Sequence, residues 1–284
     1  MNCKFLFTLA MSMVLLVGCE DSKSKEDSKP EVTEITPSKP EVTEITPEVE
    51  DYGLHQLCMS SDAPVSQVQE FLRLGGDVNK ESFDGRTLLE AHVKDNDSPE
   101  MISVLLEAGA DVNGRDGSDL VPLVLAARFN DSIEVISVLL KEGADANVMT
   151  KRGETPLMAA AMDNTSSEVI SVLIEAGADA NVRTKRGETP LMLAARHNTN
   201  PEVLLVMLEA GVDVNEKFYH DGKTLLMLAA QYNSNPEVIS VLLEAGADAN
   251  KKDNSGRNAR DYAGMNEHLQ GTPVLRELQK PANP

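Results

Sequence analysis

The chain has 284 residues, 41% of them hydrophobic, which is enough apolar material for a sizeable core in one or two domains. Its formal net charge at pH 7 is −20, and because an acidic surface repels phosphate backbones, this charge argues against nucleic acid as a partner. Aromatic residues make up only 4% of the chain and tryptophan is absent, so the core must consist mainly of Leu, Val, Ile, Ala and Met, which suits closely packed helices.

Residues 1–18 have the pattern of a secretory signal peptide. Lys4 gives a positive start, and the apolar run over 5–17 is too short for a transmembrane helix. The run ends in Leu16-Val17-Gly18-Cys19, which resembles the bacterial lipobox, in which the cysteine becomes the first mature residue and carries acyl chains such as palmitate. The alternative is an ordinary signal peptide with a chance cysteine. The resemblance implies that Cys19 is lipidated and anchors the protein to a membrane.

Residues 19–52 comprise this cysteine and a segment rich in Pro, Glu and Thr. The sequence at 29–37 recurs at 39–47. Such a composition buries too little apolar surface to fold, and its prolines favour an extended chain. A Pro-rich ligand motif is the alternative, although no aromatic residue or PxxP core accompanies it. We interpret the segment as a disordered tether.

Cys58 is the one cysteine in the body of the chain, so we expect no internal disulfide there. Its thiol could be reactive. However, Leu57-Cys58-Met59 has the pattern of a buried helix, in which a free cysteine acts as a small hydrophobe.

The body of the chain is one unit repeated. The string Gly-Ala-Asp-(Val/Ala)-Asn recurs at intervals of 34 residues and, at the last, 35. Its final residues are Asn79, where the string reads Gly-Gly-Asp-Val-Asn, then Asn113, Asn147, Asn181, Asn215 and Asn250. Neither a heptad nor a strand alternation has this period, so it indicates a repeat architecture.

Within one unit, the residues predict two short helices. Thr155-Pro156 caps a first helix over 157–162, and a turn follows at 164–166. The apolar residues of 169–174 have helical spacing, and Gly177 ends the second helix in the left-handed cap position.

The predicted start of the second helix has the same pattern in five units. Each has a residue that is favoured as an N-cap and, two residues later, a glutamate at the positive end of the helix dipole. The N-caps are Ser98, Ser132, Ser166, Asn200 and Asn235. Helices of about ten residues are unstable alone in water, so we expect the units to stack and bury their apolar faces together.

The strings Gly-Glu-Thr-Pro-Leu at 153–157 and 187–191, with the Gly-Ala-Asp segments, resemble the ankyrin repeat over roughly 54–280. The resemblance implies an all-α solenoid of stacked helix-turn-helix units with hairpin-like loops, about seven units including caps. We expect an N-terminal capping repeat at 53–82, five repeats at 83–250, and a C-terminal capping repeat and tail at 251–284.

One position departs from the family. The histidine that usually follows Thr-Pro-Leu is absent, so the hydrogen bonds it makes between neighbouring units should be lost. Its slot holds Glu90, Val124, Met158, Met192 and Met227.

The resemblance also implies protein binding through the hairpin tips and the surface of the first helices. The basic tip residues are Lys151, Arg152, Lys185 and Arg186, and the next tip carries Phe218 and Tyr219. At the ends of the first helices lie Arg128, Phe129, Arg196, His197 and Tyr232. Arg and aromatic residues are enriched at interface hot spots, so we hypothesise that these residues form the contact surface for an acidic partner. A merely solvated face is the alternative.

Catalytic signatures are absent from the sequence. It has no Gly-rich phosphate loop, no Cys/His metal spacing and no Ser/His/Asp constellation, so we expect no cofactor, no metal site and no enzymatic activity. His92 stands where other units have alanine, so we expect it to be packed. Asp145 and Asp179 lie one unit apart, too far to share an ion, and turn stabilisation explains them better.

Together these features predict a monomeric, lipid-anchored protein of the bacterial cell envelope that faces the periplasm or the exterior. It would bind another protein as a scaffold, adaptor or inhibitor. Two alternatives stay open, namely an immunity-type protective partner of a secreted toxin or enzyme, and an enzyme or enzyme subunit.

Overall fold

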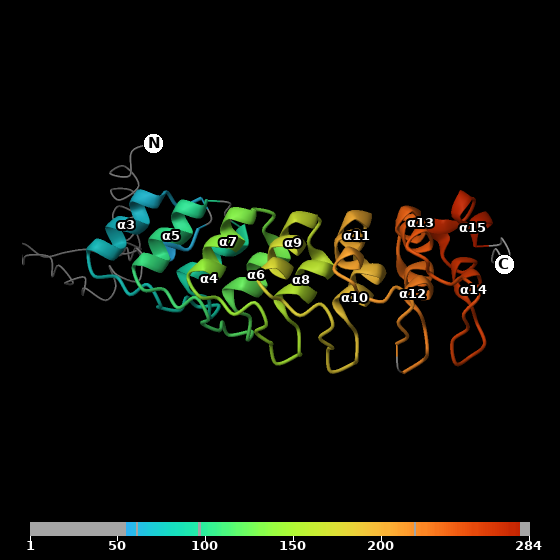
Figure 1. The fold of residues 1–284 in the computed structure, drawn as a ribbon. Helices are drawn as coiled ribbons and strands as arrows, with labels where there is room; N and C mark the ends of the chain where they lie inside the picture. Colours follow the sequence, from blue (N-terminus) through green and yellow to red (C-terminus); the bar gives the residue numbers. More distant parts are fainter. Residues whose placement is uncertain (1–54, 61, 96–97, 219, 279–284) are drawn as a thin grey trace, which may run out of the picture. The chain divides into compact units, whose positions relative to one another are not determined.

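The computed structural model describes residues 55–60, 62–95, 98–218 and 220–278, all within the compact unit Ile45–Pro284. Its helices come in pairs (Figure 1). The first helices are α4 (Leu88–Asp95), α6 (Pro122–Phe129), α8 (Pro156–Asp163), α10 (Pro190–His197), α12 (Leu225–Tyr232) and α14 (Ala259–Ala263). The second helices are α3 (Val65–Arg73), α5 (Pro99–Glu107), α7 (Ile133–Lys141), α9 (Ser167–Glu175), α11 (Pro201–Glu209), α13 (Pro236–Glu244) and α15 (Pro273–Glu277). A 3₁₀ turn, η1 (Glu267–Leu269), lies between α14 and α15.

The pairs stack in sequence order. Each first helix from α4 to α14 packs on the first helix of the next unit, and the second helices from α3 to α15 do the same in their own layer. Strand-like pairing among the described residues is one isolated bridge between Lys217 and Thr224. The predicted fold class, an all-α solenoid of helix pairs joined by loops, is therefore confirmed. The predicted boundaries between tether, caps and repeats stay predictions.

The helix ends follow the local rules read from the sequence. All five predicted N-caps of the second helices accept a backbone N–H of the first turn. Thr155 caps α8 by accepting from the backbone N–H of Met158. Gly177 has a φ of 88°, and the N–H of the following Ala178 bonds to the carbonyl of Leu173, which closes the end of α9.

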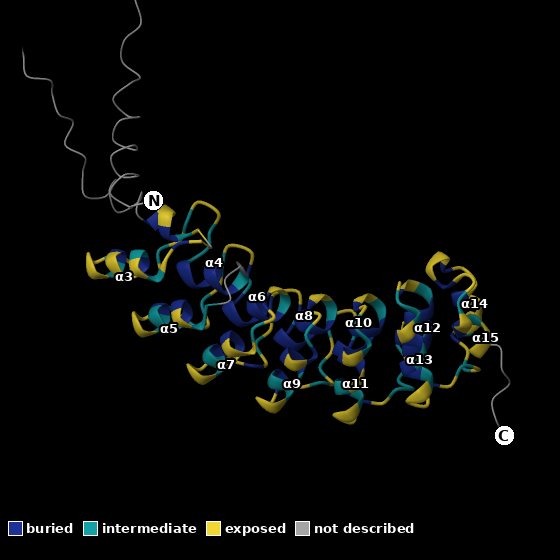
Figure 2. Cartoon of the chain, turned by 90° about the horizontal axis from the view of Figure 1, so that it is seen from above, coloured by how far each residue is buried: buried dark blue, intermediate teal, exposed yellow. Residues whose placement is uncertain are grey.

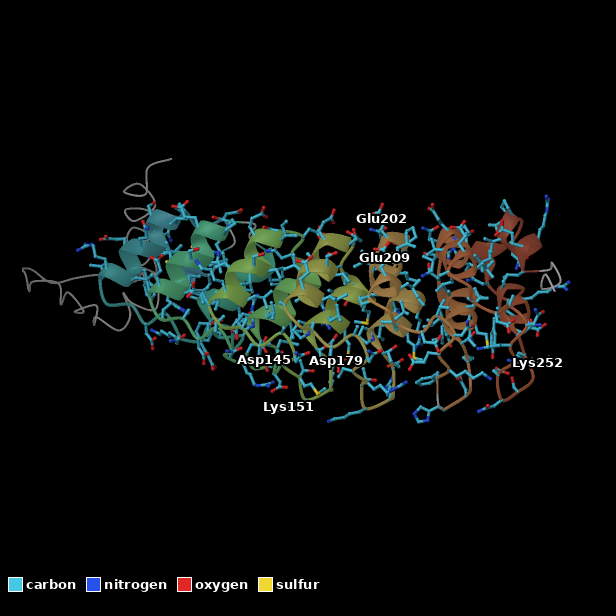
Figure 3. All side chains as sticks on the ribbon, in the orientation of Figure 1. Asp145, Lys151, Asp179, Glu202, Glu209 and Lys252 are labelled. Atoms are coloured by element: carbon cyan, nitrogen blue, oxygen red, sulfur yellow. The ribbon has the colours of Figure 1, made fainter. Side chains whose placement is uncertain are left out.

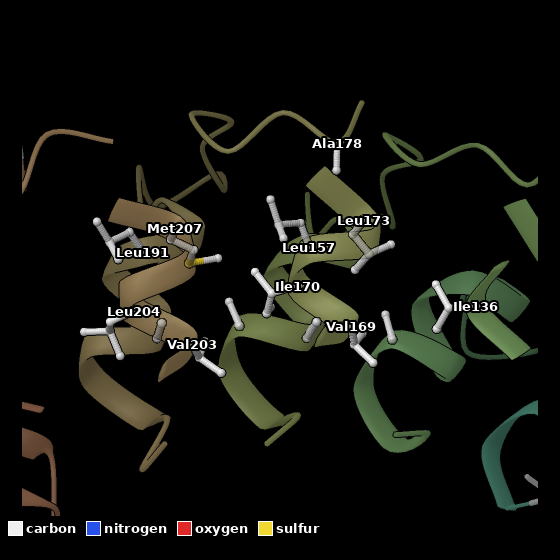
Figure 4. Close-up of a cluster of buried hydrophobic side chains, with 14 of the residues drawn as sticks. Ile136, Leu157, Val169, Ile170, Leu173, Ala178, Leu191, Val203, Leu204 and Met207 are labelled. Atoms are coloured by element: carbon white, nitrogen blue, oxygen red, sulfur yellow. The ribbon is translucent and has the colours of Figure 1, made fainter. Parts of the chain in front are cut away.

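The core runs through the whole stack. Most residues of α6, α8 and α10 are buried (Figure 2). The second helices bury one face, and Ile170 and Leu173 of α9 belong to the same apolar cluster as Val203 and Leu204 of α11 (Figure 4). All four side chains have no solvent exposure. Because every unit buries its faces against its neighbours, a single unit has no core of its own.

The slot that lacks the family's histidine is part of this core. Val124, Met158, Met192 and Met227 are buried there. Glu90 is buried too, and its carboxylate accepts hydrogen bonds from the backbone N–H and the hydroxyl of Thr87. The position therefore contributes apolar packing in most units instead of hydrogen bonds between units.

A column of buried asparagines joins the turns between first and second helices. Its members are Asn130, Asn164, Asn198, Asn233 and Asn266, each at most 6% exposed. The amide of Asn198 donates to the carbonyl oxygens of Ala161, at 3.1 Å, and Asn164, at 2.7 Å, both in the preceding unit. Its Oδ1 atom accepts from the backbone N–H of Asn200 at 2.9 Å. From the sequence, this position was predicted only as part of a turn. The recurrence of asparagine at the repeat period is the signal that could have identified the column.

A second set of asparagines lies on the surface, in the Gly-Ala-Asp segments. Asn147 donates to the carbonyl of Gly177 and accepts from the N–H of Asp179, so it joins two units. Asn79, Asn113 and Asn215 make the equivalent pair of bonds. The carboxylate of Asp145 accepts the backbone N–H of Asn147, which agrees with the predicted turn role of these aspartates. In the described part of the chain, no three His, Cys, Asp or Glu side chains cluster as metal ligands.

Cys58 and His92 lie together in the interior at the N-terminal end of the stack. Both are fully buried, as expected for packed residues, and the Nε2 atom of His92 is 2.9 Å from the carbonyl oxygen of Cys58. Burial raises the pKa of the Cys58 thiol to about 11, so the reactive thiolate is disfavoured at neutral pH.

None of the helices in the described residues is both long enough and apolar enough to cross a membrane.

Replacing Asn198 with alanine should lower the free energy of unfolding by about 3 kcal/mol, because two buried carbonyl groups and one partly buried N–H group lose their partner. Replacing Asn147 with alanine should lower the free energy of unfolding by only about 1 kcal/mol. The surroundings of Asn147 are exposed, so water can bond to the backbone groups of Gly177 and Asp179 that lose their partner. Urea unfolding followed by circular dichroism measures both losses. Equal losses would show that the buried column is no more important than the surface set.

Acidification should destabilise the fold through His92. Burial lowers its pKa in the folded protein below the ordinary value of 6.5, so the unfolded chain takes up the proton first. The contribution of His92 to stability is therefore lost as the pH falls through 6.5 towards the lower folded value. Urea unfolding at a series of pH values, compared with the His92→Gln variant, isolates this effect. A difference between the two proteins that does not change with pH would contradict it.

Candidate functional site

Successive units are connected by hairpin-like loops, here called the fingers, whose tips span 82–86, 116–120, 150–154, 184–188, 218–223 and 253–257. A backbone hydrogen bond closes each tip, as between the N–H of Thr150 and the carbonyl of Glu154 at 3.0 Å. In most tips a glycine with positive φ, such as Gly153, makes the turn. The fingers lie side by side along one edge of the stacked units (Figure 1).

Asp119 replaces this glycine in one finger. Its φ is 67°, the only positive φ among the described residues other than glycine. Its carboxylate accepts the backbone N–H of Lys151 at 2.5 Å and pairs with Arg115 at 3.2 Å. These interactions lower the pKa of Asp119, the Lys151 N–H most of all, and they compensate for the strained backbone by joining two neighbouring fingers.

Two adjacent fingers, with tips at 150–154 and 184–188, separate their charges. The predicted cations Lys151, Arg152, Lys185 and Arg186 are all exposed, and the side chain of Lys151 is 85% exposed. The carboxylates beside them turn inward, so that the side chains of Glu154 and Glu188 are only 15% and 18% exposed. Figure 3 shows Lys151 on the finger edge, whereas Glu202 and Glu209 lie on the second helix α11. The finger edge is therefore locally basic at these two tips, whereas Asp84 and Asp221 of other fingers are 52% and 40% exposed.

Arg128 ties a finger to a first helix. Its guanidinium forms ion pairs with Glu154, from the next finger, and with Asp163 at 3.1 Å. Phe129 is 49% exposed, and its ring lies 5.2 Å from the Lys94 ammonium and 5.8 Å from the Arg128 guanidinium carbon. Arg128 was expected to be an exposed contact residue, but its side chain is 17% exposed because these ion pairs enclose it.

Arg196 is held in a similar way two units further on. Its Nη1 atom lies 3.2 Å from the carboxylate of Glu188. Its guanidinium carbon is 4.4 Å from the centre of the Tyr232 ring, and that side chain is 44% exposed. His197, next to it, is exposed. The predicted pair Arg196 and Tyr232 is thus a preformed cation–π contact at the surface.

Of the two predicted tip aromatics, the structure describes Phe218. Phe218 is only partly exposed, because its ring packs on the core and lies 5.2 Å from the ring of His220. Tyr219 and Cys19 lie outside the described residues.

Two clefts open between the fingers and the first helices. The polar cleft has a volume of about 360 Å³ and is lined by Asp119, Leu120, Arg128, Lys151, Arg152 and Glu154, with residues of the tips. The second cleft, here called the aromatic cleft, has a volume of about 180 Å³. It is lined by the rings of Phe218 and Tyr232, by Met192 and Leu228, and by four charged residues, Glu188, Arg196, Asp221 and Lys223. Asp221 and Lys223 pair at 2.9 Å.

The structure thus brings together six of the predicted contact residues in two groups. Arg128, Lys151 and Arg152 share the polar cleft, and Arg196, Phe218 and Tyr232 share the aromatic cleft. The other predicted contact residues that the structure describes line neither cleft. They are Phe129, Lys185, Arg186 and His197. Sequence reasoning missed Glu154 and Glu188, which hold the two arginines, although both follow the tip glycine at a fixed position.

Comparison with known proteins supports the repeat architecture. The family model of ankyrin repeats (three copies) matches residues 54–149 and 123–218, and the ankyrin-repeat model matches residues 221–254. The crystal structure of the human ASB11 ankyrin repeat domain has a TM-score of 0.67 and 24% sequence identity. The match covers 81% of this chain and 99% of that one, and at this identity it shows the fold alone.

A search of curated proteins gives no match. The family models cover more than half of the chain, in phase with the helix pairs. The chain therefore belongs to the ankyrin-repeat family, whose fold is a protein-interaction scaffold and is typically non-enzymatic.

Proposed function

We propose that this protein is a membrane-anchored protein of the bacterial cell envelope that binds another protein through its fingers and first-helix ends, as a scaffold, adaptor or inhibitor. The observation that carries the binding proposal is the charge separation on the fingers. Four cations at equivalent positions of two adjacent tips are exposed, while the neighbouring carboxylates are turned inward. An acidic partner surface complements this edge and is repelled by the rest of the chain.

The aromatic side chains at the first-helix ends add the contacts that charge alone does not supply. Phe129 and Tyr232 occupy equivalent positions three units apart, and each is nearly half exposed beside an arginine. Large aromatic groups next to arginine are typical of the residues that contribute most to binding at protein interfaces. Their exposure in the isolated chain is consistent with a surface that a partner covers.

Anchoring rests on the N-terminal sequence. The apolar run ends in Leu16-Val17-Gly18-Cys19, and acyl chains on Cys19 would hold the protein on a membrane. The segment that follows, 20–52, would keep the repeats away from the lipid surface. In this arrangement the protein acts as a monomer that presents its finger edge in the periplasm or at the cell exterior.

Removal of the contact surface should abolish partner capture. In the surface variant, Arg152→Glu, Arg186→Glu and Tyr232→Ala are combined, which reverses two exposed tip charges and truncates one exposed ring. The wild-type protein should capture one protein from cross-linked envelope extract, and the variant should lose it. Captured proteins are identified by mass spectrometry, and thermal unfolding of the variant should be unchanged.

A matched control places the same three kinds of change on the second helices, at exposed Lys141, Arg276 and Leu205. Lys141→Glu, Arg276→Glu and Leu205→Ala together should leave capture intact. If the surface variant still captures the partner, or both variants lose it equally, binding through the finger edge is refuted.

Lipidation has its own test. When cells that make the protein are fed an alkyne-tagged palmitate, the wild-type protein should take up the label and the Cys19→Ser variant should not. The variant should also move from the membrane fraction to the soluble fraction. Cys3→Ser, in the same N-terminal segment, is the control and should keep the label. Equal labelling of Cys19→Ser and wild type would contradict anchoring through Cys19.

A further inference from the structure

The two clefts differ in chemistry and repeat the same position along the stack, two units apart. Arg128 in α6 and Arg196 in α10 occupy equivalent sites, and the unit of α8 lies between them with Met162 in that slot. Methionine has no charge and cannot pair with a finger carboxylate. The two clefts that an arginine bounds therefore lie in the units on either side of Met162. A ligand that uses both clefts must therefore span two units.

The polar cleft offers a cation that the fold does not neutralise. Arg128 is engaged by Glu154 and Asp163, and Lys151 lies 3.4 Å from Asp119. For Arg152, in contrast, there is no ion-pair partner among the residues described here, and its side chain is exposed at the rim. A planar guanidinium binds a carboxylate through two parallel hydrogen bonds, so this cleft suits an acidic side chain.

The aromatic cleft contains four charged side chains, but they form two ion pairs with one another. Both of its cations are paired, Arg196 with Glu188 and Lys223 with Asp221. Buried Met192 and Leu228 lie on its inner side, beside the rings of Phe218 and Tyr232. Its volume of about 180 Å³ is below the 300–1,000 Å³ that is usual for drug-sized ligands, and it suits one aliphatic or aromatic side chain.

The geometry also limits the backbone of the ligand. The Arg128–Glu154 and Arg196–Glu188 pairs hold the fingers against the first helices. The Nζ atom of Lys185 bonds to the carbonyl of Lys151, which joins adjacent fingers. These ties narrow the space between fingers and helices at the two clefts, where an α-helix of about 10–12 Å diameter does not fit. An extended chain can run across the row of fingers and insert single side chains.

The spacing of the clefts sets the spacing of the two anchors. Packed helices lie about 8–10 Å apart, so two units cover about 16–20 Å, which an extended chain spans in about five or six residues. We infer that the partner presents an extended acidic segment with one acidic side chain for the polar cleft and one apolar side chain for the rings of the aromatic cleft, about five or six residues apart. This inference rests on the proposed protein-binding function and specifies its ligand.

The probes that test it are fluorescein-labelled synthetic peptides in a serine and threonine background, with one glutamate and one leucine about three, six or twelve residues apart, in both orders. Their binding to the full-length protein in detergent is measured by fluorescence anisotropy. In one order, the peptide with a spacing of about six should bind about tenfold more tightly than the other spacings. Replacing its glutamate with glutamine, or its leucine with serine, should remove that advantage.

Exposed positions on the second helices supply matched control variants. Arg152→Glu should weaken the best peptide about tenfold, whereas Arg276→Glu, the same change far from both clefts, should change binding less than about twofold. Tyr232→Ala should also weaken it about tenfold, and Leu205→Ala, which truncates an exposed apolar side chain outside both clefts, should not. Unchanged thermal unfolding of all four variants confirms that their folds are intact.

Several outcomes would overturn the inference. Affinity that is independent of spacing, or equal losses with Arg152→Glu and Arg276→Glu, would mean general charge attraction. Preference for a spacing of about twelve would indicate a helical ligand. Absence of binding by every peptide up to about 1 mM would also refute it. If the wild-type protein captures a partner that the surface variant loses, while the peptides show no spacing preference, this inference fails and the proposed function stands.

Discussion

Each repeat meets the next through a side-chain amide that is buried and must keep its hydrogen bonds. The amide of Asn164 donates to the carbonyls of Ala127 and Asn130 in the preceding unit, and Asn198 repeats this pattern one unit later. A buried amide that loses these partners costs more free energy than an average hydrogen bond contributes. The column therefore allows only one register between neighbouring units, and apolar packing fills the space that this register defines.

This register also positions the candidate binding surface. Because all first helices are held in the same phase, their C-terminal residues form a row, and the fingers form a parallel row beside it. Arg128 can then reach Glu154 of the following finger, and Arg196 can stack on Tyr232 of the following unit. The clefts are a consequence of the repeat geometry. Their different chemistry comes from the few positions at which the units differ.

The chain also shows how an acidic protein can present a basic edge. Backbone N–H groups and arginine side chains bind the carboxylates of the fingers, as Lys151 and Arg115 do for Asp119. At the tips 150–154 and 184–188 the enclosed carboxylates of Glu154 and Glu188 contribute little to the outer surface, whereas Lys151 and Arg152 extend into solvent. The sign of the local field therefore depends on which charges are exposed and which are enclosed. The net charge alone does not predict it.

The sequence by itself determined the features that local rules control. These features depend on residues close together in the chain. They are the repeat period, the N-caps such as Ser166, the left-handed conformation of Gly177 and the alternation of first and second helices, and the structure agrees with each. Only the tertiary structure decided which groups meet across units. It showed that Asn164 is a buried link between units, that Glu154 encloses Arg128, and that Phe218 packs partly on the core. These outcomes depend on contacts between residues about one repeat apart, and no local pattern specifies which of several charged or aromatic neighbours will pair.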